Sequence, residues 1–187
     1  MDLFSHGLWG GIIAKTANKH KITKKPVSVF WFVFWSMIPD FFSFAVLFIW
    51  LFYGLLAGTI SLAGAGLPHP SAMEPMIGDT FFIFRFTNFF YNSSHSLIVF
   101  FIIFALVSWK KKHSAWVMSG WLIHILIDIP THSYKFYPTP FLWPLSQWKL
   151  DGYSWSHPGF LIFNYLAIFL AYFWLYRRWL KKGDKNI

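Results

Sequence analysis

The fold of this chain is decided by residues 27–57, which read VSVFWFVFWSMIPDFFSFAVLFIWLFYGLLA. Roughly 30 residues of this kind form a helix of about 45 Å, whereas the hydrocarbon core of a bilayer is about 30 Å thick. The run therefore predicts a membrane-spanning helix that breaks or protrudes. Pro39 is the expected breaking point, because it removes a backbone donor.

The composition of the whole chain agrees with a membrane protein. Of its 187 residues, 56% are hydrophobic and 24% aromatic, and only 12% are charged, against roughly 25% in soluble domains. A monomer in water would expose large apolar patches. We predict an all-α, polytopic helical bundle that forms one membrane-embedded domain over residues 1–187.

Further apolar runs give the expected number of crossings. They cover residues 81–109, 115–129 and 158–176, so that about four spans follow at about 20 residues each. Asn92-Ser93-Ser94 is expected to interrupt the second run, and the last helix is expected to start at Pro158. Residues 3–14 are too short to span and predict a re-entrant or interfacial helix.

The net charge of +9 reflects where the basic residues lie. They cluster at residues 15–25, 110–112 and 177–185, whereas residues 58–80 contain no Lys or Arg and residues 132–157 contain only two. This is the positive-inside pattern, and it predicts a multi-pass protein with both termini in the cytoplasm. No aromatic and basic groove motif accompanies the clusters, so a nucleic-acid partner is not expected. The expected partners are membrane lipids.

Five ionisable residues within apolar segments are the informative ones, because a buried charge costs about 2.5 to 3.5 kcal/mol near the bilayer centre. They are His6, Asp40, His95, His124 and Asp128. His124 and Asp128 are four residues apart and share a helix face. Counted from the basic clusters at about 1.5 Å per residue, Asp40, His95 and Asp128 each lie about 21 to 22 Å into the membrane. The sequence therefore predicts that these side chains meet at one site.

The residue types indicate a divalent metal. The chain has no Cys, so any metal must be held by imidazole or carboxylate groups. Such ligands bind Zn²⁺ first of all, with Mn²⁺ or Fe²⁺ as alternatives. A metal-activated water would make the protein a hydrolase, with catalytic roles for Asp40 and Asp128. Because the site lies near the outer leaflet, an amphiphilic ester, amide or phosphoester is the expected substrate. The residues that could contact substrate or support the site are His132, Lys135, Asp151, Arg85 and Asn92.

Other interpretations of the residues and two other functions beside the hydrolase remain open. Asp40 could cap a helix that resumes after Pro39, and a lone His could simply bond to a neighbour. Strings of His and Asp in membranes also relay protons and metals, so a transporter is the second hypothesis. A structural protein whose polar cluster only joins helices is the third.

The order of the polar motifs resembles one bacterial family. The motifs are His6-Gly7, Ile38-Pro39-Asp40, Ser94-His95-Ser96-Leu97, His124-Ile-Leu-Ile-Asp128-Ile-Pro-Thr131 and Phe141-Leu142-Trp143-Pro144. In this order the chain resembles the bacterial membrane-bound, metal-dependent hydrolases described as LexA-binding, inner-membrane-associated hydrolases. The resemblance implies a divalent-metal site formed by His6, Asp40, His95, His124 and Asp128, a hydrolase activity, and a location in the bacterial inner membrane.

Overall fold

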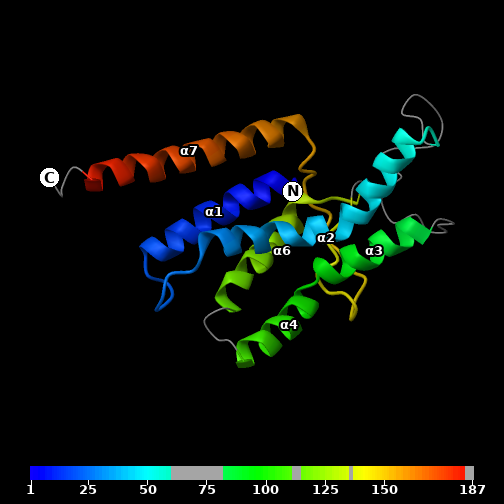
Figure 1. The fold of residues 1–187 in the computed structure, drawn as a ribbon, viewed down its shortest axis with the longest axis horizontal. Coiled ribbons are helices and arrows are strands. Elements are labelled where there is room, and N and C mark those ends of the chain that lie inside the picture. The colour runs from blue at the N-terminus through cyan, green and yellow to red at the C-terminus, as the bar shows by residue number, and fades with distance from the viewer. Residues whose placement is uncertain (60–81, 111–114, 135–136, 184–187) are drawn as a thin grey trace.

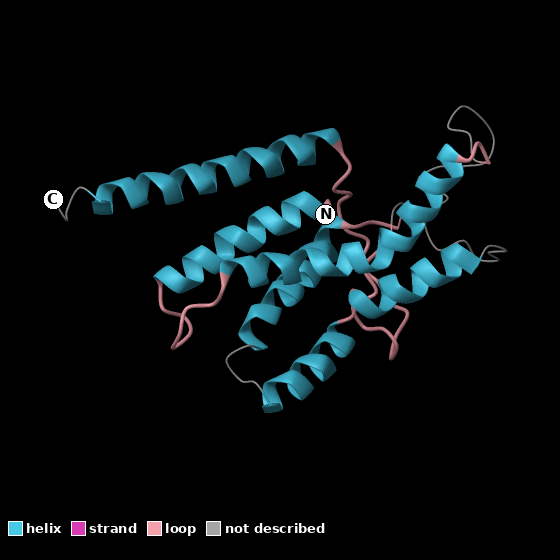
Figure 2. Ribbon diagram, viewed as in Figure 1, coloured by secondary structure: helices cyan, strands magenta, loops and turns pink. Residues whose placement is uncertain are grey.

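The computed structural model describes residues 1–59, 82–110, 115–134 and 137–183, and beyond residue 177 the backbone alone. The described residues form helices joined by loops and no strand (Figure 2). In chain order the elements are α1 (Leu3–Lys19), α2 (Val29–Leu56), α3 (Phe82–Ser94), α4 (Leu97–Lys110), the short 3₁₀ helix η2 (Trp116–Met118), α6 (Ser119–Thr131) and α7 (Pro158–Gly183).

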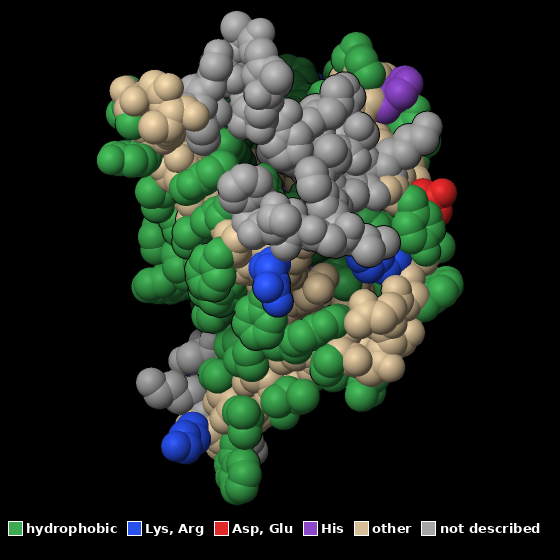
Figure 3. All heavy atoms as spheres, turned by 90° about the vertical axis from the view of Figure 1, so that its right-hand side faces the viewer, with side chains coloured by type: hydrophobic (Ala, Val, Ile, Leu, Met, Phe, Trp, Pro, Cys, Tyr) green, Lys and Arg blue, Asp and Glu red, His purple; other side chains and the backbone are tan. Residues whose placement is uncertain are grey.

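Within the described residues, two helices are long and apolar enough to cross a membrane, namely α2 and residues 158–177 of α7. The pair α3 and α4 counts as a third if its two bent halves form one span. Only 28% of the most apolar window of α2 and 11% of that of α7 is buried inside the protein. These helices therefore present most of their apolar surface outward, as lipid-facing helices do. On the face drawn in Figure 3, hydrophobic side chains cover most of the described surface.

The prediction of about four crossings is not confirmed. The run at residues 115–129 folds as η2 followed by α6, an apolar helical stretch over Trp116–Thr131 that is shorter than a full span. The Ser-rich break in the second run is confirmed, since α3 and α4 meet at a bend of 62°. The last helix begins at Pro158 as predicted, and α1 extends beyond its predicted end to Lys19.

Pro39 bends its helix without ending it. α2 continues from Val29 to Leu56 with Pro39 inside it, and Figure 1 shows the helix changing direction along its length. Asp40 consequently lies within a helix, so the interpretation of Asp40 as a helix cap is wrong. The Ser43 hydroxyl, one turn further on, donates to Pro39 O at 2.6 Å, so this carbonyl at the bend does not face hydrocarbon unpaired.

Helix α2 is the centre of the fold, because α1, α3 and α6 all pack against it (Figure 1). The approach of α6 depends on Gly120, where an added Cβ would lie 2.2 Å from the backbone oxygen of Phe32. Trp121 and Ile125 on α6 form an apolar cluster with Phe100 of α4. This packing brings the polar face of α6 against the bend of α2.

Candidate metal centre

Four ionisable side chains from three parts of the chain converge at the bend of α2. Asp40 comes from α2, His95 from the break between α3 and α4, and His124 and Asp128 from α6. Each offers one ligand atom, and these atoms all lie within 4.8 Å of one another, so the four could hold a metal ion. His95, His124 and Asp128 are fully buried, whereas the Asp40 side chain is 13% exposed.

Backbone carbonyls orient the two imidazole rings. His95 Nδ1 lies 3.1 Å from Tyr91 O and 2.9 Å from Ser94 Oγ, and His124 Nδ1 lies 2.8 Å from Ser36 O. A carbonyl only accepts, so Nδ1 carries the hydrogen in both rings and Nε2 presents a lone pair. A backbone acceptor behind the ring is the usual support of a metal-binding histidine.

The front of the site consists of acceptors facing one another. His95 Nε2 and His124 Nε2 are 3.0 Å apart, and Asp128 Oδ2 lies 3.1 Å from the latter and 3.5 Å from the former. Asp40 Oδ1 lies 3.4 Å from His95 Nε2 and 3.7 Å from His124 Nε2, and no group in the described part of the chain donates a hydrogen bond to Asp128 Oδ2. One proton can satisfy only one pair of these atoms, whereas a divalent cation satisfies all four.

Serine residues fix the break that directs His95 towards the other ligands. Ser43 Oγ on α2 lies 2.8 Å from Ser94 Oγ, and Ser94 Oγ also donates to Pro39 O at 3.3 Å. From α6, Trp121 Nε1 donates to Ser94 O at 2.5 Å. The last residue of α3 is thus tied to both helices that carry the other ligands, which holds His95 in register with them.

The second oxygen of Asp128 faces a different set of groups. His6 Nε2 lies 3.0 Å from Asp128 Oδ1 without hydrogen-bond geometry, and the His6 ring stacks on His124 with centroids 3.7 Å apart. His132 Nε2 lies 3.4 Å from the same oxygen. The amino nitrogen of Met1 contacts Asp128 Oδ1 and lies 2.7 Å from His132 Nε2. His6 is therefore adjacent to the four-residue group, where it borders both His124 and Asp128.

Two tyrosines support this arrangement, and neither belongs to the predicted site. His132 Nδ1 lies 2.7 Å from Tyr137 O, which also accepts the Tyr91 hydroxyl at 2.7 Å. The Tyr91 ring stacks on His95 with centroids 4.0 Å apart. Most of these supports are main-chain oxygens, for which a sequence gives no side-chain signal.

Three other predicted residues are described and are not members of the four-residue group. Asp151 accepts the backbone N–H of Tyr134 at 2.9 Å, Arg85 is exposed on α3, and Asn92 lines a small separate pocket with Tyr91. Lys135 lies outside the described residues.

Comparisons with other proteins leave the family open. The chain matches no protein-family model, no curated protein and no solved structure. The candidate function therefore rests on the geometry of the four buried ligands.

Proposed function

We propose that this protein is a metal-dependent hydrolase embedded in the bacterial inner membrane, with several crossings and both termini in the cytoplasm. The observation that carries the proposal is the convergence of four ligand atoms from Asp40, His95, His124 and Asp128, which all lie within 4.8 Å of one another. Zn²⁺ suits this mixed nitrogen and oxygen set best, followed by Mn²⁺ or Fe²⁺. When bound, such an ion lowers the pKa of a coordinated water from 15.7 towards about 7.

The ligands differ in what they can contribute. The buried residues His95, His124 and Asp128 hold the ion, because their side chains are enclosed on all sides. Asp40 is the partly exposed member and is placed to accept the proton that the attacking water releases. It then returns this proton to the leaving group, as a general base and acid does. The residues converge on one point and form no ladder across the membrane, which favours hydrolysis over transport.

The amphiphilic character of the substrate follows from the surroundings. The four ligands lie within a protein whose outer surface is largely apolar, so substrates that partition into the bilayer reach it most readily. An ester, amide or phosphoester with an apolar part fits this setting.

Metal analysis of the purified full-length protein tests the proposal. We expect about one equivalent of metal in the wild type and in His20→Ala, an exposed histidine in the link between α1 and α2, and none in His95→Ala or Asp128→Asn. Ester hydrolysis should disappear with the metal on chelation and return when Zn²⁺ is added. Metal content that is equal in all four proteins, or hydrolysis that survives in His95→Ala, would contradict the proposal.

A further inference from the structure

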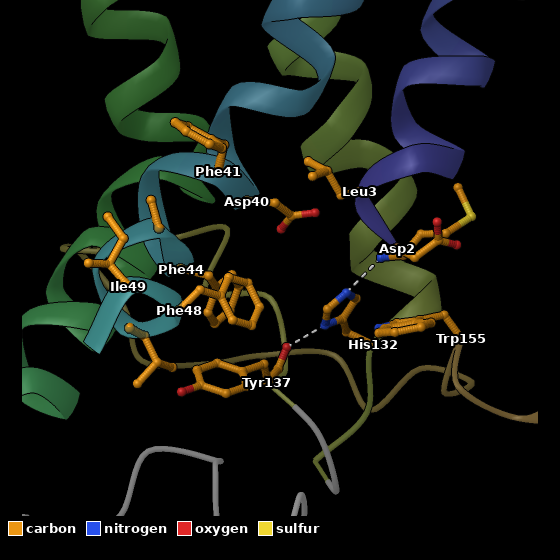
Figure 4. Close-up of a pocket in the computed structure, with 13 residues that line it drawn as sticks. Asp2, Leu3, Asp40, Phe41, Phe44, Phe48, Ile49, His132, Tyr137 and Trp155 are labelled. Carbon is orange, nitrogen blue, oxygen red and sulfur yellow. Dashed lines mark hydrogen bonds between the residues drawn. The ribbon is translucent and has the colours of Figure 1, made fainter. Parts of the chain in front are cut away.

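An apolar cavity adjoins the metal centre. It has a volume of about 660 Å³ and lies between the second half of α2, the start of α1 and the loops that follow α6 (Figure 4). Phe44, Ala45 and Phe48 line it from α2, and Tyr137 lines it from the loop. In Figure 4 the carboxylate of Asp40 points into this space.

The cavity is the approach to the ligands. Asp40 is both a wall of the cavity and the partly exposed member of the four-residue group. His132, which lies 3.4 Å from Asp128, lines it as well. Among the described residues, His95, His124 and Asp128 are closed to the surface. A molecule that reaches the centre from the cavity must therefore pass apolar walls.

The cavity is also elongated and open at the side. Its lining on α2 runs from Asp40 to Ile49, which is about 14 Å along a helix. Phe48 and Ile49 at the far end are exposed on the outer surface of α2. The polar end thus lies at the candidate metal and the apolar end opens towards lipid.

We propose that this cavity binds the acyl chain of an amphiphile and thereby selects acyl esters as the substrates of the centre. The inference rests on the proposed function. A cavity of this volume suits one drug-sized ligand, which matches a single chain and is too small for a complete two-chain lipid. The apolar wall continues up to Asp40. An acyl chain bound in the cavity therefore places the ester bond at its end beside the metal centre.

The chemical step follows from that placement. Water oxygen forms a bond to the acyl carbonyl carbon, and the bond from this carbon to the alcohol oxygen breaks. Asp40 accepts a proton from the water and the departing alkoxide receives one, so that ester and water give a carboxylic acid and an alcohol. The acid product keeps its chain in the cavity until it leaves sideways into the bilayer.

Acyl hydroxamates test the inference by binding alone, because they carry a metal-binding head on a chain of chosen length. The full-length protein is loaded with Co²⁺, whose visible spectrum reports a ligand at the metal, and is titrated with acetyl and octanoyl hydroxamate. Ala45→Trp fills the cavity, and Ala45→Leu fills it less. Val46→Trp is the matched control, because Val46 is exposed on the same helix and does not line the cavity.

We expect acetyl hydroxamate to bind all four proteins equally, which also shows that each centre has formed. Octanoyl hydroxamate should bind the wild type and Val46→Trp at least about tenfold more tightly than Ala45→Trp, since each buried methylene contributes up to about fourfold. Ala45→Leu should be intermediate. Detergent solvates the chain equally in every sample, so the difference between proteins reports the cavity.

The outcomes separate the two proposals. Equal octanoyl binding in all four proteins, with a normal acetyl response, would overturn the cavity inference and leave the metal centre intact. Cavity-dependent octanoyl binding without any ester turnover would refute the hydrolase and keep the cavity as a ligand site. Absence of Co²⁺ binding would overturn both.

Discussion

Replacement of Gly120 by alanine should disable the metal centre through a clash one turn away from it. The new Cβ would lie 2.2 Å from Phe32 O and 3.0 Å from Ser36 N, and both are backbone atoms that cannot rotate away. Ordinary contact begins at 3.4 Å, so α6 must retreat from α2 by about 1.2 Å. His124, four residues further along the same face of α6, must move with it.

The displacement is large compared with the tolerance of the site. The bond from His124 Nδ1 to Ser36 O is 2.8 Å and would lengthen to about 4 Å, which is beyond hydrogen-bond range. Ligand distances at metals tolerate only about 0.2 Å, and loss of such a supporting bond typically weakens metal binding by about 10 to 100 times. We expect a loss of at least tenfold in Gly120→Ala.

The free energy of unfolding is a second quantity that Gly120→Ala should change. Alanine in place of glycine favours a helix by about 1 kcal/mol, whereas overpacking costs about 1 to 3 kcal/mol, so the clash should equal or exceed the gain. Competition with a chromophoric chelator measures metal affinity, and thermal unfolding of the purified protein measures stability.

Gly159→Ala is the matched control. The nearest atom to its added Cβ is His157 Nδ1 at 3.4 Å, so neither readout should fall. Wild-type metal affinity together with a raised unfolding temperature in Gly120→Ala would refute the reasoning.

Three further substitutions probe other contacts. Tyr91→Phe removes the hydroxyl that donates to Tyr137 O and should lower the free energy of unfolding by about 1 kcal/mol, with metal content unchanged; metal loss would show that the hydroxyl matters to the ligands themselves. Asn164→Leu removes two hydrogen bonds from α7 to α1 and should lower the free energy of unfolding by about 1 to 3 kcal/mol. Denaturant unfolding in detergent measures this loss, and an unchanged midpoint would argue against a stabilising role of these bonds. Asp40→Asn should abolish ester hydrolysis in steady-state assays while reducing metal content less than Asp128→Asn, and unchanged turnover would remove Asp40 from its proposed role.

The central helix and the grouping of the polar residues could be predicted because both follow from simple geometry. A long apolar run implies a helix of known rise, and this rise predicts that Asp40, His95 and Asp128 lie at one level. The spacing of His124 and Asp128 likewise settled that they share a face. The local sequence therefore identifies the candidate ligands, and the structure brings four of them together.

The remaining features depend on contacts between distant segments. That Pro39 bends α2 and does not end it depends on α1, α3 and α6 packing around it, which no local propensity shows. The place of His6 beside Asp128 requires α1 to lie against α2 and α6. The orientation of His132 depends on a carbonyl five residues later in a loop, and the number of spans depends on where the bundle lies relative to lipid.

The bend between α3 and α4 also links distant parts of the chain during biogenesis. It creates the start of a helix inside an apolar region, where free N–H groups are costly. Ser96 Oγ accepts the N–H groups of Ile98 and Val99, and Phe141 O accepts that of Leu97. Since Phe141 is synthesised more than 40 residues after Leu97, this helix start stays incomplete in a nascent chain until the later loop emerges. The start of α4 is therefore completed only when the loop that follows α6 is in place.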